Sequence, residues 1–255
     1  MDLQHLLIPA AALVASLLTL ISGFGLGTLL LPVFALFFPL PLAVGMTAVV
    51  HLLNNLFKAT LLWRHADRGV LLAFGIPAVL GALAGVWTLD RLGHMAPLYH
   101  GMRKEVGPLA IAIAVLMVVF AITELAPRLK AFAFAGRHHV VGGALSGFFG
   151  GLSGHQGALR SMFLLRSGLG KEAYIATGVM IAVLVDLTRI PLYLRTLNTE
   201  ALLHEGPLLL AAVLAAFAGA WAGKELIPSI TYRTVQWTVA VLMVLIAGML
   251  VAGIA

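Results

Sequence analysis

The sequence predicts an all-α polytopic membrane protein made of two inverted repeats, each with about five helical segments. Hydrophobic residues make up 61% of the chain and charged residues only 10%. The charges cluster between apolar runs, several of which are about as long as a helix needs to cross a hydrocarbon core of roughly 30 Å. Glycine-rich breaks interrupt these runs at matching places in the two halves, and such breaks are typical of transporter binding sites.

Five apolar segments are expected in each half. They cover residues 3–21, 27–38, 42–62, 70–89 and 106–124, and then residues 139–150, 156–166, 171–194, 201–222 and 232–254. The second segment of each half is too short to cross a bilayer alone. We expect it to form a re-entrant half-helix, or a stub packed inside the bundle, after a glycine break. The expected units are a first membrane repeat over 1–125, a cytoplasmic connecting loop over 126–138 and a second membrane repeat over 139–255.

The positions of the two breaks favour a repeat. The breaks begin at Ser22-Gly23 and Ser153-Gly154, 131 positions apart. The same offset pairs Asn55 with Asp186, Lys58 with Arg189, and Arg64 with Arg195. Only six of the 43 residues over 22–64 are identical at this offset, so the repeat is inferred from the breaks and the polar positions.

Spaced glycines recur in both halves, as Gly81-x-x-x-Gly85 and Gly219-x-x-x-Gly223. This spacing of small residues lets membrane helices approach each other closely. The alternative interpretation is that glycines are simply common in membrane helices.

The loop charges favour inverted copies. If both segments around each break turn back or both cross, one side of the membrane collects nine loop cations and the other side four. Parallel repeats of four crossings would divide them six against seven. The positive-inside rule favours the first arrangement, which places both termini outside the cytoplasm. In a cell with an outer membrane we expect the cell inner membrane, because the spanning segments are helical.

Several function classes are excluded by what the sequence lacks. It has no cysteine, so disulfides, thiolate metal sites and cysteine nucleophiles are excluded. There is no His-Glu-x-x-His, no phosphate-binding loop and no Gly-x-Ser-x-Gly, so we predict neither an enzyme nor a cofactor. The net charge of +6 reflects loop residues and does not indicate a nucleic-acid partner.

Three basic residues, Lys58, Arg160 and Arg189, fall inside apolar segments. A charge facing lipid at mid-bilayer costs roughly 2.5–3.5 kcal/mol, so such residues normally face the bundle interior or a wet cavity. Lys58 and Arg189 could instead snorkel to the headgroups. Arg160 follows the second break, where a half-helix N-terminus favours anions and a planar guanidinium suits an oxyanion. Alternatively, Arg160 has a structural role and holds neighbouring helices together without contacting a solute.

Other polar residues accompany these cations. Asp186 is three residues before Arg189, so both project from one helix face, and an internal ion pair is the favoured interpretation. The equivalent amides, Asn54 and Asn55, could contact a solute or bridge helices. His51 and His155 could each carry a coupled proton near neutral pH or form helix–helix hydrogen bonds.

The serine-glycine break, its copy at mid-chain and the polar-basic segment two helices further on resemble the sulfite exporter TauE/SafE family. The resemblance covers nearly the whole chain. Typical members carry Gly-x-Gly-Gly-Gly in both copies, where this chain has Gly23-Phe24-Gly25-Leu26-Gly27 and Gly150-Gly151-Leu152-Ser153-Gly154-His155-Gln156-Gly157. His155, Gln156 and Arg160 replace the apolar residues expected after the glycines, and they make this site more polar and more cationic than the family pattern.

The resemblance implies export of small anions such as sulfite, sulfoacetate or related organosulfonates. The membrane segments contain three cationic residues and one acidic residue, and this excess of positive charge suits an anionic substrate. We expect alternating access, in which the repeats rock about the breaks. The candidate substrate-binding residues are Ser22, Gly23, Gly25, Gly27, Thr28, Asn54, Asn55, Lys58, Ser153, Gly154, His155, Gln156, Arg160, Asp186 and Arg189.

Two alternatives remain open at this point. A permease for a divalent metal cation would use Asp186, His51, His155 and Asn55, although no resident metal is predicted. A non-transporting membrane subunit would use the glycines only for helix packing. The expected partners are the small anion, the lipid bilayer, a coupled proton and a second copy in a homodimer.

Overall fold

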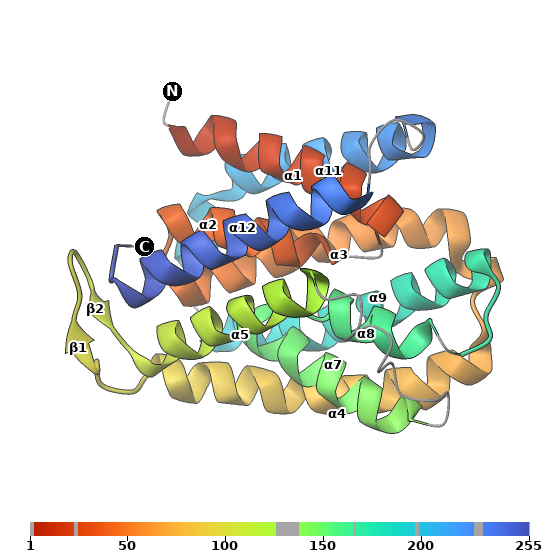
Figure 1. Ribbon diagram of the computed structural model, residues 1–255, viewed down its shortest axis with the longest axis horizontal. Helices are drawn as coiled ribbons and strands as arrows, with labels where there is room; N and C mark the ends of the chain where they lie inside the picture. The colour runs from red at the N-terminus through yellow and green to blue at the C-terminus, as the bar shows by residue number, and fades with distance from the viewer. Residues whose placement is uncertain are drawn as a thin grey trace.

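The protein is a bundle of helices that run along its long axis, as the computed structural model shows (Figure 1). The structure describes residues 3–22, 25–125, 138–165, 167–196, 199–226 and 232–254. The expected connecting loop over 126–138 lies outside these ranges except for its last residue. The all-α polytopic class predicted from the sequence is confirmed.

The helices lie where the apolar segments predict them. The first half contains α1 (Leu3–Ser22), α2 (Leu26–Phe37), α3 (Leu40–Leu62), the 3₁₀ turn η1 (Trp63–His65), α4 (Arg68–Gly93) and α5 (Pro108–Leu125). The second half contains α7 (His139–Ser153), α8 (Gly157–Leu164), α9 (Lys171–Thr196), α10 (Thr199–His204), α11 (Gly206–Leu226) and α12 (Tyr232–Val251). Within the described ranges, Leu40–His65, Arg68–Gly93 and Lys171–Arg195 are long and apolar enough to cross a membrane, and the other apolar helices are shorter.

The two halves exchange partners across the bundle. The first helix of each half packs against the helix formed by the fourth apolar segment of the other half, since α1 contacts α11 and α7 contacts α4. In the same way α3 packs against α9 and α5 packs against α12. In Figure 1, α1 runs away from the end that carries both termini, whereas α7 runs toward it. Inverted repeats require this opposite direction, and the repeat relationship itself stays a prediction.

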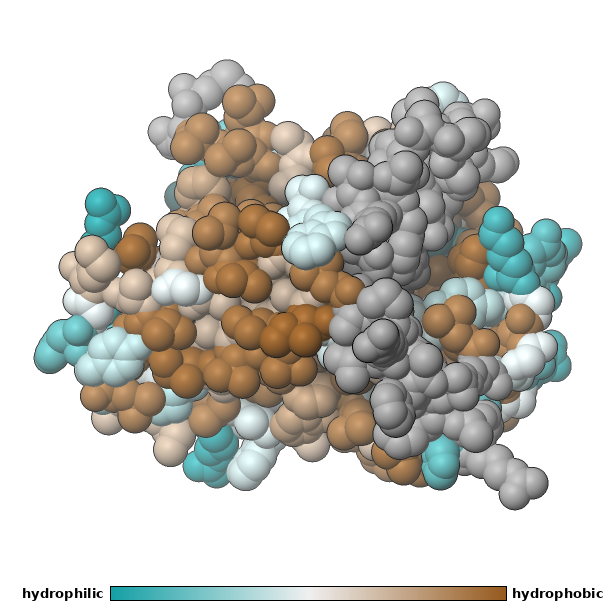
Figure 2. All heavy atoms as spheres, in the orientation of Figure 1, coloured by the Kyte–Doolittle hydropathy of each residue, from teal (hydrophilic) through white to brown (hydrophobic). Residues whose placement is uncertain are grey.

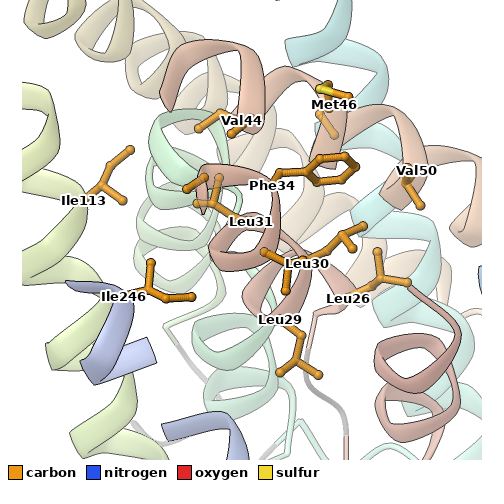
Figure 3. Packing of buried hydrophobic residues seen from close by; sticks show 14 of the residues in the cluster. Leu26, Leu29, Leu30, Leu31, Phe34, Val44, Met46, Val50, Ile113 and Ile246 are labelled. Carbon is orange, nitrogen blue, oxygen red and sulfur yellow. The ribbon is translucent and has the colours of Figure 1, made fainter. Parts of the chain in front are cut away.

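Helix α2 is a short helix in the middle of the bundle. It has 12 residues, and the ten from Leu26 to Ala35 are all buried. Figure 3 shows its leucines and Phe34 surrounded by Val44 and Met46 of α3, Ile113 of α5 and Ile246 of α12. A helix that is apolar all round belongs inside a protein core. The short segment of the first half is therefore a stub packed within the bundle.

Glycines bring the backbones of α4 and α7 into direct contact. A Cβ atom added at Gly81 or Gly85 would lie 2.1 Å from a carbonyl oxygen of α7. On the opposing helix, a Cβ at Gly147 would lie 1.9 Å from the carbonyl oxygen of Ala78. The close approach predicted for Gly81-x-x-x-Gly85 is present, and so is that of Gly219, which meets the carbonyl of Leu13 on α1. Gly223 has no described side-chain environment.

The outer surface of the bundle is apolar, as a lipid-facing surface must be. Large hydrophobic side chains are exposed on most of the long helices, among them Leu80 of α4, Trp221 of α11 and Leu245 of α12. In Figure 2 hydrophobic residues cover the middle of the visible face, and hydrophilic residues lie mostly toward its two ends. This pattern is typical of a protein whose long axis crosses a bilayer.

A short hairpin that the sequence analysis did not predict closes one end of the bundle. Strands β1 (Tyr99–His100) and β2 (Glu105–Val106) pair antiparallel between α4 and α5. The hairpin tip donates backbone hydrogen bonds to the two residues that follow α12, from Met102 N to Ala252 O at 2.8 Å and from Lys104 N to Gly253 O at 2.9 Å. It thereby joins the first half of the chain to the end of the second.

We expect Gly147→Ala to destabilise the protein by about 1–3 kcal/mol, because the added methyl group forces two packed backbones apart. The matched control is Gly248→Ala on α12, where a Cβ would meet nothing within 4 Å. Thermal unfolding in detergent should show a lower Tm for Gly147→Ala and an unchanged or higher Tm for the control. Equal Tm values for the two variants would contradict the tight α4–α7 contact.

Candidate functional site

The two glycine breaks meet in the interior of the protein. A Cβ on Gly25, which precedes α2, would lie 3.4 Å from the Cα and N atoms of Gly157, the first residue of α8. A Cβ on Gly27 would lie 2.9 Å from the carbonyl oxygen of Gly154. Gly154 ends α7 with φ at +79°, a left-handed conformation that favours glycine. Breaks 131 positions apart in the sequence therefore form one contact.

The N-termini of α2 and α8 both lie at this contact. Each helix begins with backbone N–H groups that have no partner within the helix and that carry a partial positive charge. Thr28, in the first turn of α2, is buried and its Oγ1 has no hydrogen-bond partner in the described part of the chain. Ser22 is the last residue of α1, with no described side chain, and Gly23 lies outside the described residues.

Asp186 is the centre of a buried polar network next to the breaks. Its Oδ2 lies 2.5 Å from the ring Nδ1 of His51, so it joins α9 to α3. Its Oδ1 accepts a hydrogen bond of 2.9 Å from Arg189 Nε and one of 3.3 Å from Gln156 Nε2. Asn55, one turn after His51, donates to the His51 carbonyl at 2.9 Å. The carboxylate therefore contacts residues from both halves.

Arg189 and Tyr193 bind the end of α7. Arg189 Nη1 donates to the carbonyl oxygen of Gly150 at 2.6 Å, and the hydroxyl of Tyr193 donates to the carbonyl of Gly151. The terminal carbonyls of a helix have no partners within it, and cations favour that end. Arg189 is fully buried and its Nη2 lies 2.8 Å from Asp186 Oδ1. The ion pair favoured from the sequence is present, and Arg189 does not snorkel.

Lys58 and Arg160 form a second cationic group. Lys58 on α3 is 7% exposed and Arg160 on α8 is 8% exposed, and their charges repel each other across the interior. The Nε atom of Arg160 lies 3.5 Å from the position of a Cβ on Gly178 of α9. Its Nη1 has no hydrogen-bond partner in the ranges that the structure describes. Lys58 and Arg160, one from each half of the chain, are thus both buried in the interior.

Two further candidates, Asn54 and His155, contact α1 and α5 respectively. Asn54 accepts a 3.0 Å hydrogen bond from Ser16 of α1, which makes it a bridge between helices. His155 stacks on Phe120 of α5 with ring centroids 5.4 Å apart, and its Nδ1 lies 3.1 Å from both the carbonyl and the hydroxyl oxygen of Ser153. Its Nε2 has no partner among the described residues.

Four residues of this site were missed by the sequence analysis. They are Ser16, Thr47, Ser146 and Tyr193, all buried. Ser146 donates a 3.0 Å hydrogen bond to the carbonyl of Gln156 and so fixes the second break. One signal in the sequence could have identified these residues. Each is a hydroxyl-bearing residue within an apolar segment, and a hydroxyl group inside a membrane needs a hydrogen-bond partner.

The fold and this buried, positively charged centre define a polytopic helical membrane protein with broken helices at mid-bundle. The chain belongs to the sulfite exporter TauE/SafE family, whose family model matches residues 8–250. The resemblance seen in the sequence is thereby confirmed, and the chain is a multi-pass membrane transporter. Neither a curated protein nor a solved structure matches the chain.

We expect Arg189→Met to destabilise the protein by about 3–5 kcal/mol, because it leaves the Asp186 carboxylate buried without its main partner. The double variant Asp186→Asn/Arg189→Met removes both charges and should recover a large part of this loss. Thermal unfolding of the single and double variants in detergent measures the difference. Additive effects of the two substitutions would contradict the ion pair.

Proposed function

We propose that this transporter carries small anions such as sulfite, sulfoacetate or related organosulfonates out of the cell across the inner membrane. Transport would occur by alternating access between two inverted repeats. The observation that supports this most is the excess of positive charge in the interior. The buried charged side chains of the described residues are Lys58, Arg160, Arg189 and Asp186, which leave an excess of two positive charges.

An excess buried charge is costly, and an anion would remove that cost. Asp186 already contacts Arg189 and His51, so its negative charge is largely balanced by these two neighbours. Lys58 and Arg160 are both buried and their charges repel each other, and the Nη1 of Arg160 has no hydrogen-bond partner among the described residues. An oxyanion between these two cations would accept hydrogen bonds and neutralise the repulsion.

The converging helix ends favour the same charge. The N-termini of α2 and α8 point their partial positive charges at the contact of the breaks. Gly27 and the carbonyl of Gly154 pack too closely to admit an anion between them in this conformation. We therefore place the anion beside the breaks, toward Arg160 and Lys58, with the breaks acting as the pivot of the two halves.

The alternative of a divalent metal cation fits the same residues less well. Both carboxylate oxygens of Asp186 are engaged by His51, Arg189 and Gln156. His155 is stacked on Phe120, and in the described ranges no three His, Cys, Asp or Glu side chains gather into a group that could hold a metal. A metal ion would also have to enter beside buried cations.

We expect small anions to stabilise the protein in detergent and Arg160→Gln to abolish the effect. A ligand present at 100 times its Kd stabilises the folded state by about 2.7 kcal/mol, which a thermal-shift measurement detects. The compounds to compare are sulfite, thiosulfate, sulfoacetate, taurine, lactate, cobalt and nickel. Arg195→Gln is the matched control, because Arg195 lies exposed near the end of α9.

Three outcomes would overturn this proposal or the role that it gives to Arg160. Stabilisation by cobalt or nickel alone would assign the site to a metal cation. Stabilisation by an anion that persists in Arg160→Gln would make Arg160 a structural residue. If no compound shifts Tm while proteoliposomes also show no anion flux, the interpretation as a non-transporting subunit is favoured.

We further propose that His51 carries a coupled proton. The homodimer expected from the sequence is a separate prediction. The imidazole faces Asp186 and Arg189 of α9, Arg160 of α8 and Asn55 of its own helix. A change in its protonation would alter the link between α3 and α9, which joins the two halves.

For His51→Gln we expect anion flux into proteoliposomes to lose its dependence on a pH gradient. Glutamine keeps a polar group toward Asp186 but binds no proton near neutral pH. The control is His94→Gln, because His94 is exposed just after the end of α4. Flux that responds to the gradient equally in both variants would exclude His51 as the proton carrier.

A further inference from the structure

An open pocket of about 360 Å³ lies where α9 begins. Its lining residues are His65, Gly170, Lys171, Glu172 and Ala173. His65 Nε2 lies 3.6 Å from Glu172 Oε2, and both side chains are exposed. The backbone N–H of Asp67 donates a 2.9 Å hydrogen bond to Thr177 Oγ1, which holds the connection after η1 against α9. The pocket therefore lies between the two halves of the chain and is lined by charged and ionisable side chains.

One face of α9 leads from this pocket to Arg160. Lys171, Tyr174 and Gly178 are spaced three and four residues apart, so they lie on the same face of the helix. Gly178 lies directly against the guanidinium of Arg160. Seven residues of an α-helix rise about 10 Å, so Arg160 lies about two helical turns below the pocket. Because Gly178 has no side chain, this face leaves room for the arginine.

Tyr174 lies on this face of α9, between Lys171 at the pocket and Gly178 next to Arg160. It is half-buried and packs against a buried cluster that contains Phe74, Phe163 and Leu164. Its phenolic oxygen interacts electrostatically with the guanidinium of Arg160. The side chain of Tyr174 therefore packs against α8, the helix that carries Arg160, at a position of α9 between Lys171 and Gly178.

We propose that this pocket is the entrance through which the anion reaches Arg160, and that Tyr174 is the gate between them. The inference rests on the proposed anion transport and adds its access route and a specificity-determining residue. Lys171 supplies a positive charge at the mouth, and His65 lies beside the one acid of the lining, Glu172. The phenol hydroxyl can donate to an oxyanion as it moves from the pocket to the guanidinium.

The absence of cysteine from the whole sequence permits a direct test. In Gly178→Cys the single thiol lies next to Arg160, and a membrane-impermeant maleimide that carries sulfonate groups reports whether an anion reaches it. Leu187→Cys is the control on the same helix, since Leu187 is 51% exposed on the apolar outer surface. We expect Gly178→Cys to be labelled in membrane vesicles of one orientation only, with sulfoacetate slowing the reaction, and Leu187→Cys to stay unlabelled.

The gate is tested by changing Tyr174 in the Gly178→Cys background. Tyr174→Ala removes the ring and should make labelling several-fold faster. Tyr174→Phe keeps the ring and should leave labelling as slow as with tyrosine, while weakening protection by sulfoacetate because the hydroxyl is lost. The Tm of each variant, measured in detergent, establishes that it is folded.

The results separate the entrance from the function on which it rests. Labelling that sulfoacetate slows but that Tyr174→Ala leaves unchanged would overturn the gate and leave anion transport standing. Labelling that Tyr174→Ala accelerates but that none of the tested anions slows would overturn the anion function and the role of the pocket with it. Labelling of Leu187→Cys as fast as Gly178→Cys would overturn the route along this face of α9.

Discussion

The break after α7 depends on the hydrogen bonds that Arg189 and Tyr193 donate to its last carbonyl groups. A helix that ends inside a membrane leaves carbonyl oxygens that water cannot reach, and each unsatisfied group costs several kcal/mol. The guanidinium of Arg189 gives the Gly150 carbonyl a second donor besides the Gly154 N–H, and it adds a favourable charge at the helix C-terminus. The guanidinium must itself be neutralised, and Asp186 does this from the same face of α9. The end of α7, the ion pair of Arg189 with Asp186 and the contact of Asp186 with His51 are thus linked, because each group neutralises or binds the next.

The same requirement explains why the breaks can serve as a binding region. Once the C-terminus of α7 is satisfied by side chains, the N-terminus of α8 a few residues later still presents N–H groups toward the interior. The tight contacts of Gly25 with Gly157 and of Gly27 with Gly154 bring the start of α2 to the same place. The positive ends of α2 and α8 therefore meet in the interior of the protein, where Lys58 and Arg160 are also buried.

Much of this arrangement could be predicted from the sequence. Apolar length and glycine spacing placed the helices, and an offset of 131 residues identified the pairs of breaks and polar residues. Asp186 and Arg189 could be paired because three-residue spacing places both on one helix face. The exchange of helices between halves could not be predicted, because Gly147 carries no information on which backbone it will touch. The hairpin at Tyr99–Val106 was missed because its two-residue strands have no periodic pattern.

The two halves differ in the charged residues that they place in the interior. At the offset that relates them, Asp186 and Arg189 correspond to Asn55 and Lys58. The second half therefore neutralises its own cation, whereas the first half places an uncharged amide one turn before Lys58. Arg160 has the apolar Leu29 at the corresponding position, so it adds a charge that the first half does not balance. Among the described residues, Arg189 is neutralised by Asp186 of its own half, and the interior keeps an excess of positive charge. This excess is the observation on which the proposal of anion transport rests.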